Sequence, residues 1–448
     1  MHVQRWTENE KTQGQNALSG HNIQLFRHDT CRSIPADAAD ILPGKNGDPV
    51  FRLPVTATSA TCVTGLVVHD TATYWSLFGK GVIITLIQIG GMGVVTIGIA
   101  IMKATGRKLS LSQLSTMKES ISAPQVGGIM HLTGFIIKGT LIVELAGAVL
   151  LAPVFISDFG FVKGIGYSLF HSISAFCNAG FDLLGVREQF SSLTTYSANA
   201  YLNTVIMLLI VVGGIGFLTW SDVMTHKLKF KKYSFQSKLV MQTSLLLIVI
   251  PALCFFFFEY SDLGMKERTL SSVFQSVTAR TAGFNTQDLS QMSESGTMTM
   301  IVLMLIGGSP GSTAGGMKTA TFAVLLLGAI TVFRRKNDVE CFNRRVPDNA
   351  IRNAGAILFM YLCLFITSGM IISRYEGLPL ITCLFETGSA VGTVGLTLGI
   401  TPELSVLSKS ILMFLMFFGR VGGLTLIYAA VSSSESAKGR RPVDKIAI

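Results

Sequence analysis

Four short stretches of the chain share a spacing that suits the binding of a dehydrated cation. Each places an alanine a few residues before a glycine, and the pairs are Ala60 and Gly65, Ala175 and Gly180, Ala279 and Gly283, and Ala390 and Gly395. Glycine tolerates the positive φ that turns successive backbone carbonyls in one direction. Rings of such carbonyls can replace the hydration shell of an ion. The spacing therefore predicts four loops that together coordinate one cation.

The loop residues favour a monovalent cation. The stretches 61–65, 177–180, 281–283 and 393–395 contain no acidic side chain, whereas sites for divalent ions use carboxylates. Each loop follows a short helix, and the partial negative charge at a helix C-terminus favours a cation over an anion. We expect the ion to be lined by Thr64, Gly65, Ala179, Gly180, Ala282, Gly283, Val394 and Gly395.

The elements that must position these loops form an internal repeat. The four stretches recur at intervals of roughly one hundred residues, which indicates repeated supersecondary units. Each unit is predicted to contain a long helix, a short re-entrant helix, the glycine loop and a closing long helix. We place a polar N-terminus at 1–54 and units at 55–130, 131–232, 233–346 and 347–448. Because the N-terminal stretch contains no apolar run, either this end was altered or the first unit lacks its opening helix.

Composition places these units in a membrane. The chain of 448 residues is 49% hydrophobic and 14% charged, which is too apolar for an ordinary soluble protein. A soluble alternative would need a core larger than such a chain can enclose. Runs long enough to cross a hydrocarbon layer of about 30 Å lie at 81–102, 132–155, 200–221, 239–258, 351–373 and 409–431. The predicted fold class is an all-α polytopic membrane protein with four units around a pseudo-fourfold pore.

The formal net charge of +10 does not indicate a nucleic-acid partner. The basic residues gather in short linkers after the closing helices, at 103–108, 227–232, 334–345 and 438–441. An excess of lysine and arginine in short loops marks the cytoplasmic side of a membrane protein. We therefore expect a multi-pass protein of the cell inner or plasma membrane, with the glycine loops facing outward.

The closing helix of unit three is interrupted. The stretch 307–316 contains five glycines and a proline, which do not continue an α-helix. Unwound backbone at membrane depth must be buried in protein or line water. We interpret the glycine clusters of the other closing helices as sites of close packing, so that only this helix is broken. The alternative is an extramembrane loop between two interfacial helices. The predicted gate consists of Gly307, Gly308, Ser309, Gly311, Ser312, Thr313, Gly315 and Gly316.

Charged residues within membrane spans cost free energy, so we interpret them first as functional residues. Arg420 is expected to pair with backbone carbonyls of the 307–316 loop or to lie just below the pore, and a purely structural pairing is the alternative. Lys318 adjoins the loop and is included in the gate. Glu144 lies mid-span with no partner evident from the sequence, and we expect Arg280 and Glu386 to brace the loops from the short helices.

An enzymatic function is not supported by these residues. No Cys-x-x-Cys or Cys/His spacing indicates a metal site. An intramembrane hydrolase needs a nucleophile paired with a base, and His171 with its neighbouring serines is the only faint candidate. An inverted-repeat secondary transporter of another small solute also uses broken helices. Four similar units favour a central pore over that two-part design.

Several of these stretches together resemble the Trk/Ktr/HKT superfamily of potassium transporters, and the chain is most similar to the membrane subunit of the bacterial Ktr system. The resemblance covers roughly 55–448. The matching stretches, beside the Gly307–Gly316 loop, are Thr56–Gly65, Asn178–Phe181, Arg280–Asn285, Thr393–Thr397 and Gly419–Gly422. The family has a first transmembrane helix where this chain has polar sequence.

The resemblance implies potassium uptake through a selectivity filter, and it implies that this uptake is stimulated by sodium. It implies that Gly65, Gly180, Gly283 and Gly395 bind K+, that the 307–316 loop is a gate, and that Arg420 lies beside it. Expected partners are a second copy in a homodimer, membrane lipid and a cytosolic ring of nucleotide-binding RCK-type subunits. K+ is then the substrate and Na+ the coupling or activating ion. No cofactor is expected on this chain, which has no Rossmann-type glycine motif.

Overall fold

The computed structural model describes residues 49–93, 96–99, 129–227 and 229–422. The predicted polar N-terminus therefore lies almost entirely outside the described residues. The same holds for the basic linkers at 103–108 and 438–441, and for the expectation that unit one has no opening helix.

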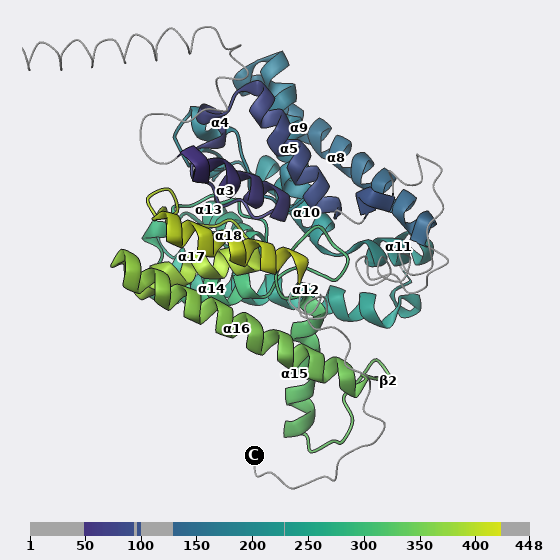
Figure 1. The fold of residues 1–448 in the computed structure, drawn as a ribbon. Helices are drawn as coiled ribbons and strands as arrows, with labels where there is room; N and C mark the ends of the chain where they lie inside the picture. The colour runs from purple at the N-terminus through teal and green to yellow at the C-terminus, as the bar shows by residue number, and fades with distance from the viewer. Residues whose placement is uncertain (1–48, 94–95, 100–128, 228, 423–448) are drawn as a thin grey trace, which may run out of the picture.

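Helices make up most of the described chain (Figure 1). They are α3 (Pro49–Cys62), α4 (Thr71–Tyr74), α5 (Leu77–Met92), α8 (Ile129–Phe159), α9 (Phe161–Phe176), α10 (Ala200–Gly214), α11 (Phe217–His226), α12 (Phe235–Cys254), α13 (Met265–Thr278), α14 (Glu294–Leu305), α15 (Thr319–Phe333), α16 (Asp348–Glu376), α17 (Leu380–Gly392) and α18 (Val406–Val421). A π-helical turn, Phe255–Glu259, extends α12. The strands β1 (Glu340–Cys341) and β2 (Arg344–Arg345) form a small antiparallel hairpin.

The described helices include several that can cross a membrane. Three are long and apolar enough by themselves, at Leu132–Phe159, Phe235–Glu259 and Asp348–Glu376. The helices α10 and α11 pass the same test together, although they are bent by 98° at their junction. The described helices therefore support the multi-pass helical membrane class, and two of the six predicted runs, 81–102 and 409–431, extend beyond the described residues.

The prediction that only the closing helix of unit three is broken is wrong. The helices α5, α10 and α18 also end at or next to glycines with positive φ, namely Gly93 at 84°, Gly216 at 96° and Gly422 at 87°. Residues with a side chain rarely adopt such φ angles, whereas glycine adopts them readily. The glycine clusters therefore turn the backbone, in addition to any close packing that they allow.

The four short helices that precede the glycine loops occupy the centre of the packing. Helix α3 packs on α5 and α18, α9 on α8 and α10, α13 on α10 and α12, and α17 on α14, α16 and α18. Figure 1 shows α3 beside α18, so the first and last described helices are neighbours. The aligned alanines of these helices, Ala60, Ala175, Ala279 and Ala390, are each 0% exposed. Their small side chains allow the close approach of surrounding elements.

Candidate functional site

The first three loop glycines lie side by side. A Cβ atom built on Gly65 would lie 2.6 Å from the carbonyl oxygen of Ala179 and 3.2 Å from the Cα of Gly180. A Cβ built on Gly180 would lie 2.9 Å from both the carbonyl oxygen of Ala282 and the Cα of Gly283. Each glycine thus faces the residue before the next glycine and leaves no room for a side chain.

The fourth loop closes this arrangement into a ring. A Cβ on Gly283 would collide with the carbonyl oxygen of Val394 and lie 3.4 Å from the Cα of Gly395. A Cβ on Gly395 would collide with the carbonyl oxygen of Thr64 and lie 2.9 Å from the Cα of Gly65. The structure therefore brings together all eight residues that the sequence assigned to the ion-lining loops.

The four loops also share one backbone conformation. The glycines have φ values of 96°, 68°, 82° and 93° in chain order. The residue two positions before each glycine is also left-handed, and these residues are Val63, Asn178, Thr281 and Thr393, with φ of 56°, 57°, 67° and 51°. Left-handed angles are unfavourable for β-branched residues and persist only where the surroundings impose them.

Two of the loops are held through their glycine N–H groups. The hydroxyl Oγ of Ser59 accepts a hydrogen bond from Gly65 N at 3.0 Å, and that of Ser389 accepts one from Gly395 N at 3.0 Å. Each serine directly precedes the aligned alanine of its short helix. These bonds fix the glycines from behind, so that their N–H groups do not face the ring.

The other two loops are held through a carbonyl. Ser174 Oγ donates to the carbonyl oxygen of Phe181 at 2.6 Å, and Thr278 Oγ1 donates to that of Phe284 at 2.5 Å. These hydroxyls occupy the same position before the aligned alanine as the serines of the first and fourth loops. One hydroxyl on each short helix therefore supports the loop that follows it, by one of two hydrogen-bonding patterns.

The ring offers oxygen atoms and no fixed charge of its own. Thr64 and Thr393 are 0% exposed, and their Oγ1 atoms have no hydrogen-bond partner within the described part of the chain. Buried polar oxygens without a partner carry a desolvation cost. Carbonyl and hydroxyl oxygens in this arrangement can coordinate a dehydrated monovalent cation.

The interrupted closing helix packs directly against the ring. Its two halves are tied together where they separate, because Gly307 N donates to the Met317 carbonyl at 2.7 Å. A Cβ on Gly315 would collide with the side chain of Thr393, and one on Gly316 would lie 2.9 Å from the carbonyl oxygen of Gly392. The 307–316 loop therefore contacts the base of the fourth glycine loop.

The same loop is bonded to the broken closing helix of unit two. Ser309 N donates to the Gly214 carbonyl at 3.0 Å, and Phe217 N donates to the Gly311 carbonyl at 2.8 Å. Thr313 Oγ1 donates to the carbonyl of Phe176, the last residue of α9, at 3.0 Å. The loop thus fills hydrogen-bonding positions that the break between α10 and α11 leaves open.

Arg420 joins this loop to unit one. Its Nη1 donates to the Thr313 carbonyl, and its Nη2 donates to the carbonyl of Gly90 and, at 3.2 Å, to that of Gly91. Lys318 lies at the other side, where its Nζ donates to the Ala314 carbonyl at 2.9 Å. Within the described residues neither cation forms a salt bridge to a carboxylate.

The two residues expected to brace the loops differ in their placement. Glu386 lies on α17, is 0% exposed, and accepts hydrogen bonds from Leu398 N at 3.1 Å, from Thr401 Oγ1 at 2.7 Å and from Thr397 Oγ1. It therefore ties the short helix to the segment after the fourth glycine. Arg280 was expected within a short helix, but it lies two residues beyond the last residue of α13.

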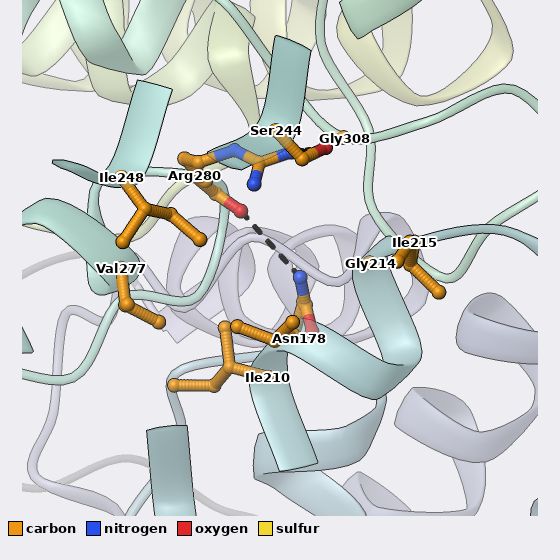
Figure 2. Close-up of a pocket in the computed structure, with 10 residues that line it drawn as sticks. Asn178, Ile210, Gly214, Ile215, Ser244, Ile248, Val277, Arg280 and Gly308 are labelled. Atoms are coloured by element: carbon orange, nitrogen blue, oxygen red, sulfur yellow. Dashed lines mark hydrogen bonds between the residues drawn. The ribbon is translucent and has the colours of Figure 1, made fainter. Parts of the chain in front are cut away.

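Arg280 borders a small cavity at the junction of the second and third loops. Figure 2 shows its guanidinium group next to Ser244, to which Nη2 donates at 3.0 Å. The amide of Asn178 approaches from below, and its Nδ2 lies 3.5 Å from the Arg280 carbonyl oxygen. Turning that amide over would let its nitrogen donate to the carbonyls of Ala175 and Ile210, both at 3.2 Å. The drawn orientation links the second loop to the third, whereas the turned amide bonds to α9 and α10 within unit two.

Glu144 has a partner that the sequence did not reveal. Its two carboxyl oxygens lie 2.9 Å and 3.0 Å from Gln88 Nε2, and Cys177 Sγ lies 3.7 Å from Oε1. The contact joins α8 to α5 and to the end of α9. His171, the faint hydrolase candidate, is fully engaged, because Nδ1 contacts the Tyr167 carbonyl at 2.7 Å and Nε2 accepts from Leu183 N at 3.3 Å.

Comparison with known proteins identifies the family. The model of the family TrkH, described as cation transport protein, matches residues 50–440. The chain belongs to the TrkH family. This confirms the resemblance to the Trk/Ktr/HKT superfamily, which consists of membrane ion transporters rather than enzymes.

Individual members of the TrkH family cover most of this chain. The potassium/sodium uptake protein NtpJ of Enterococcus hirae is 38% identical over 392 residues, which is 86% of each chain. The Ktr system potassium uptake protein B of Bacillus subtilis is 38% identical over 387 residues, 85% of this chain and 86% of the relative. The crystal structure of the potassium transporter TrkH from Vibrio parahaemolyticus covers 86% of this chain with a TM-score of 0.66 and 18% identity, over 79% of its own length, which supports the fold.

Proposed function

We propose that this chain takes up K+ across the cell membrane, and that the ring of glycine loops is its selectivity filter. The observation that carries the proposal is the closed order of the ring, in which each glycine abuts the carbonyl before the next one. The filter consists of the carbonyl oxygens at Thr64, Gly65, Ala179, Gly180, Ala282, Gly283, Val394 and Gly395. The names of the relatives, which include potassium uptake proteins of the Ktr system, support K+ as the substrate.

The 307–316 loop, together with Lys318 and Arg420, is proposed as the gate. Its place against the ring and its bonds to units one, two and four support this role. An ion that leaves the filter toward the cytoplasm must pass a loop lined by two cations, and like charges repel. Moving the loop aside lowers this barrier.

Further components of the proposed mechanism come from the family. Na+ acts as a coupling or activating ion, and no cofactor is bound by the chain itself. Names of relatives that denote a Ktr system support a partnership with other Ktr components. We propose a homodimer, embedded in membrane lipid, on a cytosolic ring of nucleotide-binding RCK-type subunits that controls the gate.

The test is uptake in a bacterial strain that requires external K+ because its own uptake systems are deleted. The wild-type chain, expressed with its regulatory partner, is expected to restore growth at low K+, and Gly395→Asp is expected to abolish the rescue, since the new side chain would collide with the Thr64 carbonyl. Gly399→Asp is the matched control, because Gly399 has φ of 91° but open space around its Cβ position. Failure of the wild type to restore growth, or equal rescue by Gly395→Asp, would contradict the proposal.

Selectivity is tested with the purified chain in liposomes. Gly283→Ser is expected to lower the ratio of K+ to Na+ flux about tenfold, because a displaced ring costs about 1.4 kcal/mol or more of differential ion binding. A Cβ at this position would collide with the Val394 carbonyl. An unchanged ratio of K+ to Na+ flux in the folded variant would show that the ring does not determine selectivity.

A further inference from the structure

Glu144 is a carboxyl group buried within a membrane span. Its residue is 2% exposed, and it lies in α8 between exposed apolar residues that face the surrounding lipid, such as Leu141 and Leu145. The backbone carbonyl of Glu144 accepts a bond from Ser172 Oγ at 2.6 Å. An ionised carboxylate at such a place is costly unless a cation or several donors surround it.

The donors around this carboxyl group are few. Gln88 Nε2 donates to both carboxyl oxygens, and the Cys177 thiol is a weak donor at 3.7 Å. No lysine or arginine among the described residues lies within salt-bridge distance of it. The other amide atom, Gln88 Oε1, is buried and has no donor in the described part of the chain. With Glu144 ionised, the two side chains together contain three acceptor oxygens, and Gln88 Oε1 is left without a donor.

A proton on Glu144 removes this mismatch. A carboxylic acid can donate its O–H to Gln88 Oε1 while its other oxygen accepts from Gln88 Nε2, after a small rotation of the amide. This reciprocal pair is neutral and satisfies every polar atom of both side chains. An ionised carboxylate, which only accepts, leaves Gln88 Oε1 without a partner in either amide orientation.

We propose that Glu144 is a proton-binding site within the membrane, and that its protonated form is the one in this structure. The proton comes from water and returns to it, so no other reactant is needed. The protonated Glu144 holds α5 against α8 through Gln88. Gln88 lies two residues before Gly90 and three before Gly91. Because Arg420 binds the carbonyls of those glycines and of Thr313, the site is connected to the 307–316 loop.

The other ionisable groups on the packed elements do not replace this proton. On α5, Lys80 Nζ is bonded to the Ala72 carbonyl at 2.7 Å. On α9, His171 has both ring nitrogens engaged, as described above, and Cys177 is the weak donor at the site. On α10, Tyr201 donates its hydroxyl to the Leu150 carbonyl at 2.9 Å. Lys138, on α8 itself, is exposed.

Loss of the proton changes what Arg420 binds. The bare carboxylate leaves Gln88 Oε1 without a donor and so loosens the contact of α5 with α8. A displaced α5 moves the carbonyls of Gly90 and Gly91, which hold the guanidinium group of Arg420 beside Thr313. Release of Thr313 frees the loop. Uptake by the wild type is therefore expected to rise from mildly acidic to mildly alkaline buffer. This consequence depends on the proposed gate, whereas the protonation itself does not.

The first test is infrared spectroscopy of the full chain in liposomes, comparing wild type with Glu144→Gln. The carbonyl stretch of a protonated carboxyl group is expected in the wild type at neutral pH, absent from Glu144→Gln and shifted in Gln88→Leu. Its absence from the folded wild type would overturn the proposal. This readout stays valid even if the chain carries no K+.

The second test is the pH profile of uptake. Glu144→Gln mimics the neutral acid, so it is expected to lose the pH-dependent part of uptake and to retain the level of acidic buffer. Glu376→Gln is the control, because this carboxylate at the end of α16 accepts from Ser405 N at 2.9 Å, away from the site. It is expected to keep the wild-type slope. A wild-type slope in Glu144→Gln would overturn the link to the loop.

Discussion

The closing helices of units two and three break at corresponding places but in different ways. Between α10 and α11 the break is short, and the chain turns through 98° at Ile215 and Gly216. Between α14 and α15 the break runs from Ile306 to Lys318. The first is a sharp bend, whereas the second inserts a loop against the ring of glycines.

The two breaks are bonded to one another. The N–H of Ser309 and the carbonyl of Gly311, both in the long break, pair with Gly214 and Phe217 on either side of the short one. The short break needs these partners because its own backbone groups are left open. The comparison indicates that unit two provides a platform and that the loop of unit three rests on it. A resting loop can be moved, whereas a bend within a continuous chain cannot be removed without refolding the helix.

The largest effect should come from shortening the long break. Replacing residues 309–315 by two glycines is expected to raise flux in liposomes about tenfold or more, since removal of 1.4 kcal/mol from a barrier gives a factor of ten. Isotope influx under a fixed K+ gradient measures this effect. Flux at the wild-type level would mean that the long break obstructs the path no more than the short one.

The folded state of that variant is checked by its elution as a single species in detergent and by its K+ preference. The ring should keep its preference, because the hydroxyls that support it lie on the short helices and not on the loop. A loss of K+ preference would show that the loop also shapes the filter, and would contradict the view that the loop only rests on unit two.

An intermediate effect is expected from Arg420→Gln. The variant loses the charge-assisted bonds to Thr313 and Gly90, each contributing roughly 1.5–3 kcal/mol when the donor is charged. Flux should rise several-fold but less than after shortening the loop, because the bonds to unit two remain. Arg374→Gln, in the last turn of α16, is the control and should leave flux unchanged. A fall in flux would assign Arg420 to conduction rather than to holding the loop.

The smallest effect is expected from Thr313→Val, which removes the single bond from Oγ1 to the Phe176 carbonyl. A neutral hydrogen bond contributes about 1 kcal/mol, so flux should rise by a factor of about five at most. Ser312→Ala is matched to it, because Ser312 Oγ forms hydrogen bonds within the loop, where it donates to the Ser309 carbonyl and accepts from Ala314 N. Equal effects of both variants would show that the loop's own conformation matters more than its contact with α9.

The residues of the ring could be predicted because alanine and glycine recur there at a nearly constant spacing, which is visible in the sequence alone. The loop of unit three was equally visible, since five glycines and a proline interrupt an apolar run. The break at Gly216 and the ends of α5 at Gly93 and of α18 at Gly422 were not predicted, although their glycine clusters were noted. A glycine in an apolar helix fits both close packing and a turn of the backbone, and only the observed φ distinguishes them.

Other features could not be predicted because they depend on contacts between distant segments. Nothing near Glu144 in the sequence points to Gln88, which lies 56 residues earlier. The left-handed conformation of Val63 has no local signal, since a β-branched residue disfavours it. The serine and threonine before the aligned alanines, by contrast, were present in every unit, and their hydroxyl groups could have been read as supports for the loops.

Those four hydroxyls support the ring of glycine loops in two different ways. Two neighbouring sides, those of the first and fourth loops, are anchored at a glycine nitrogen, and the other two at an oxygen beyond the glycine. The proposed filter therefore has four loops of similar backbone conformation that are supported in two different ways. The stiffness of the loops can differ from one to the next, and replacement of a single serine by alanine should soften one loop while the atoms proposed to bind the ion stay the same.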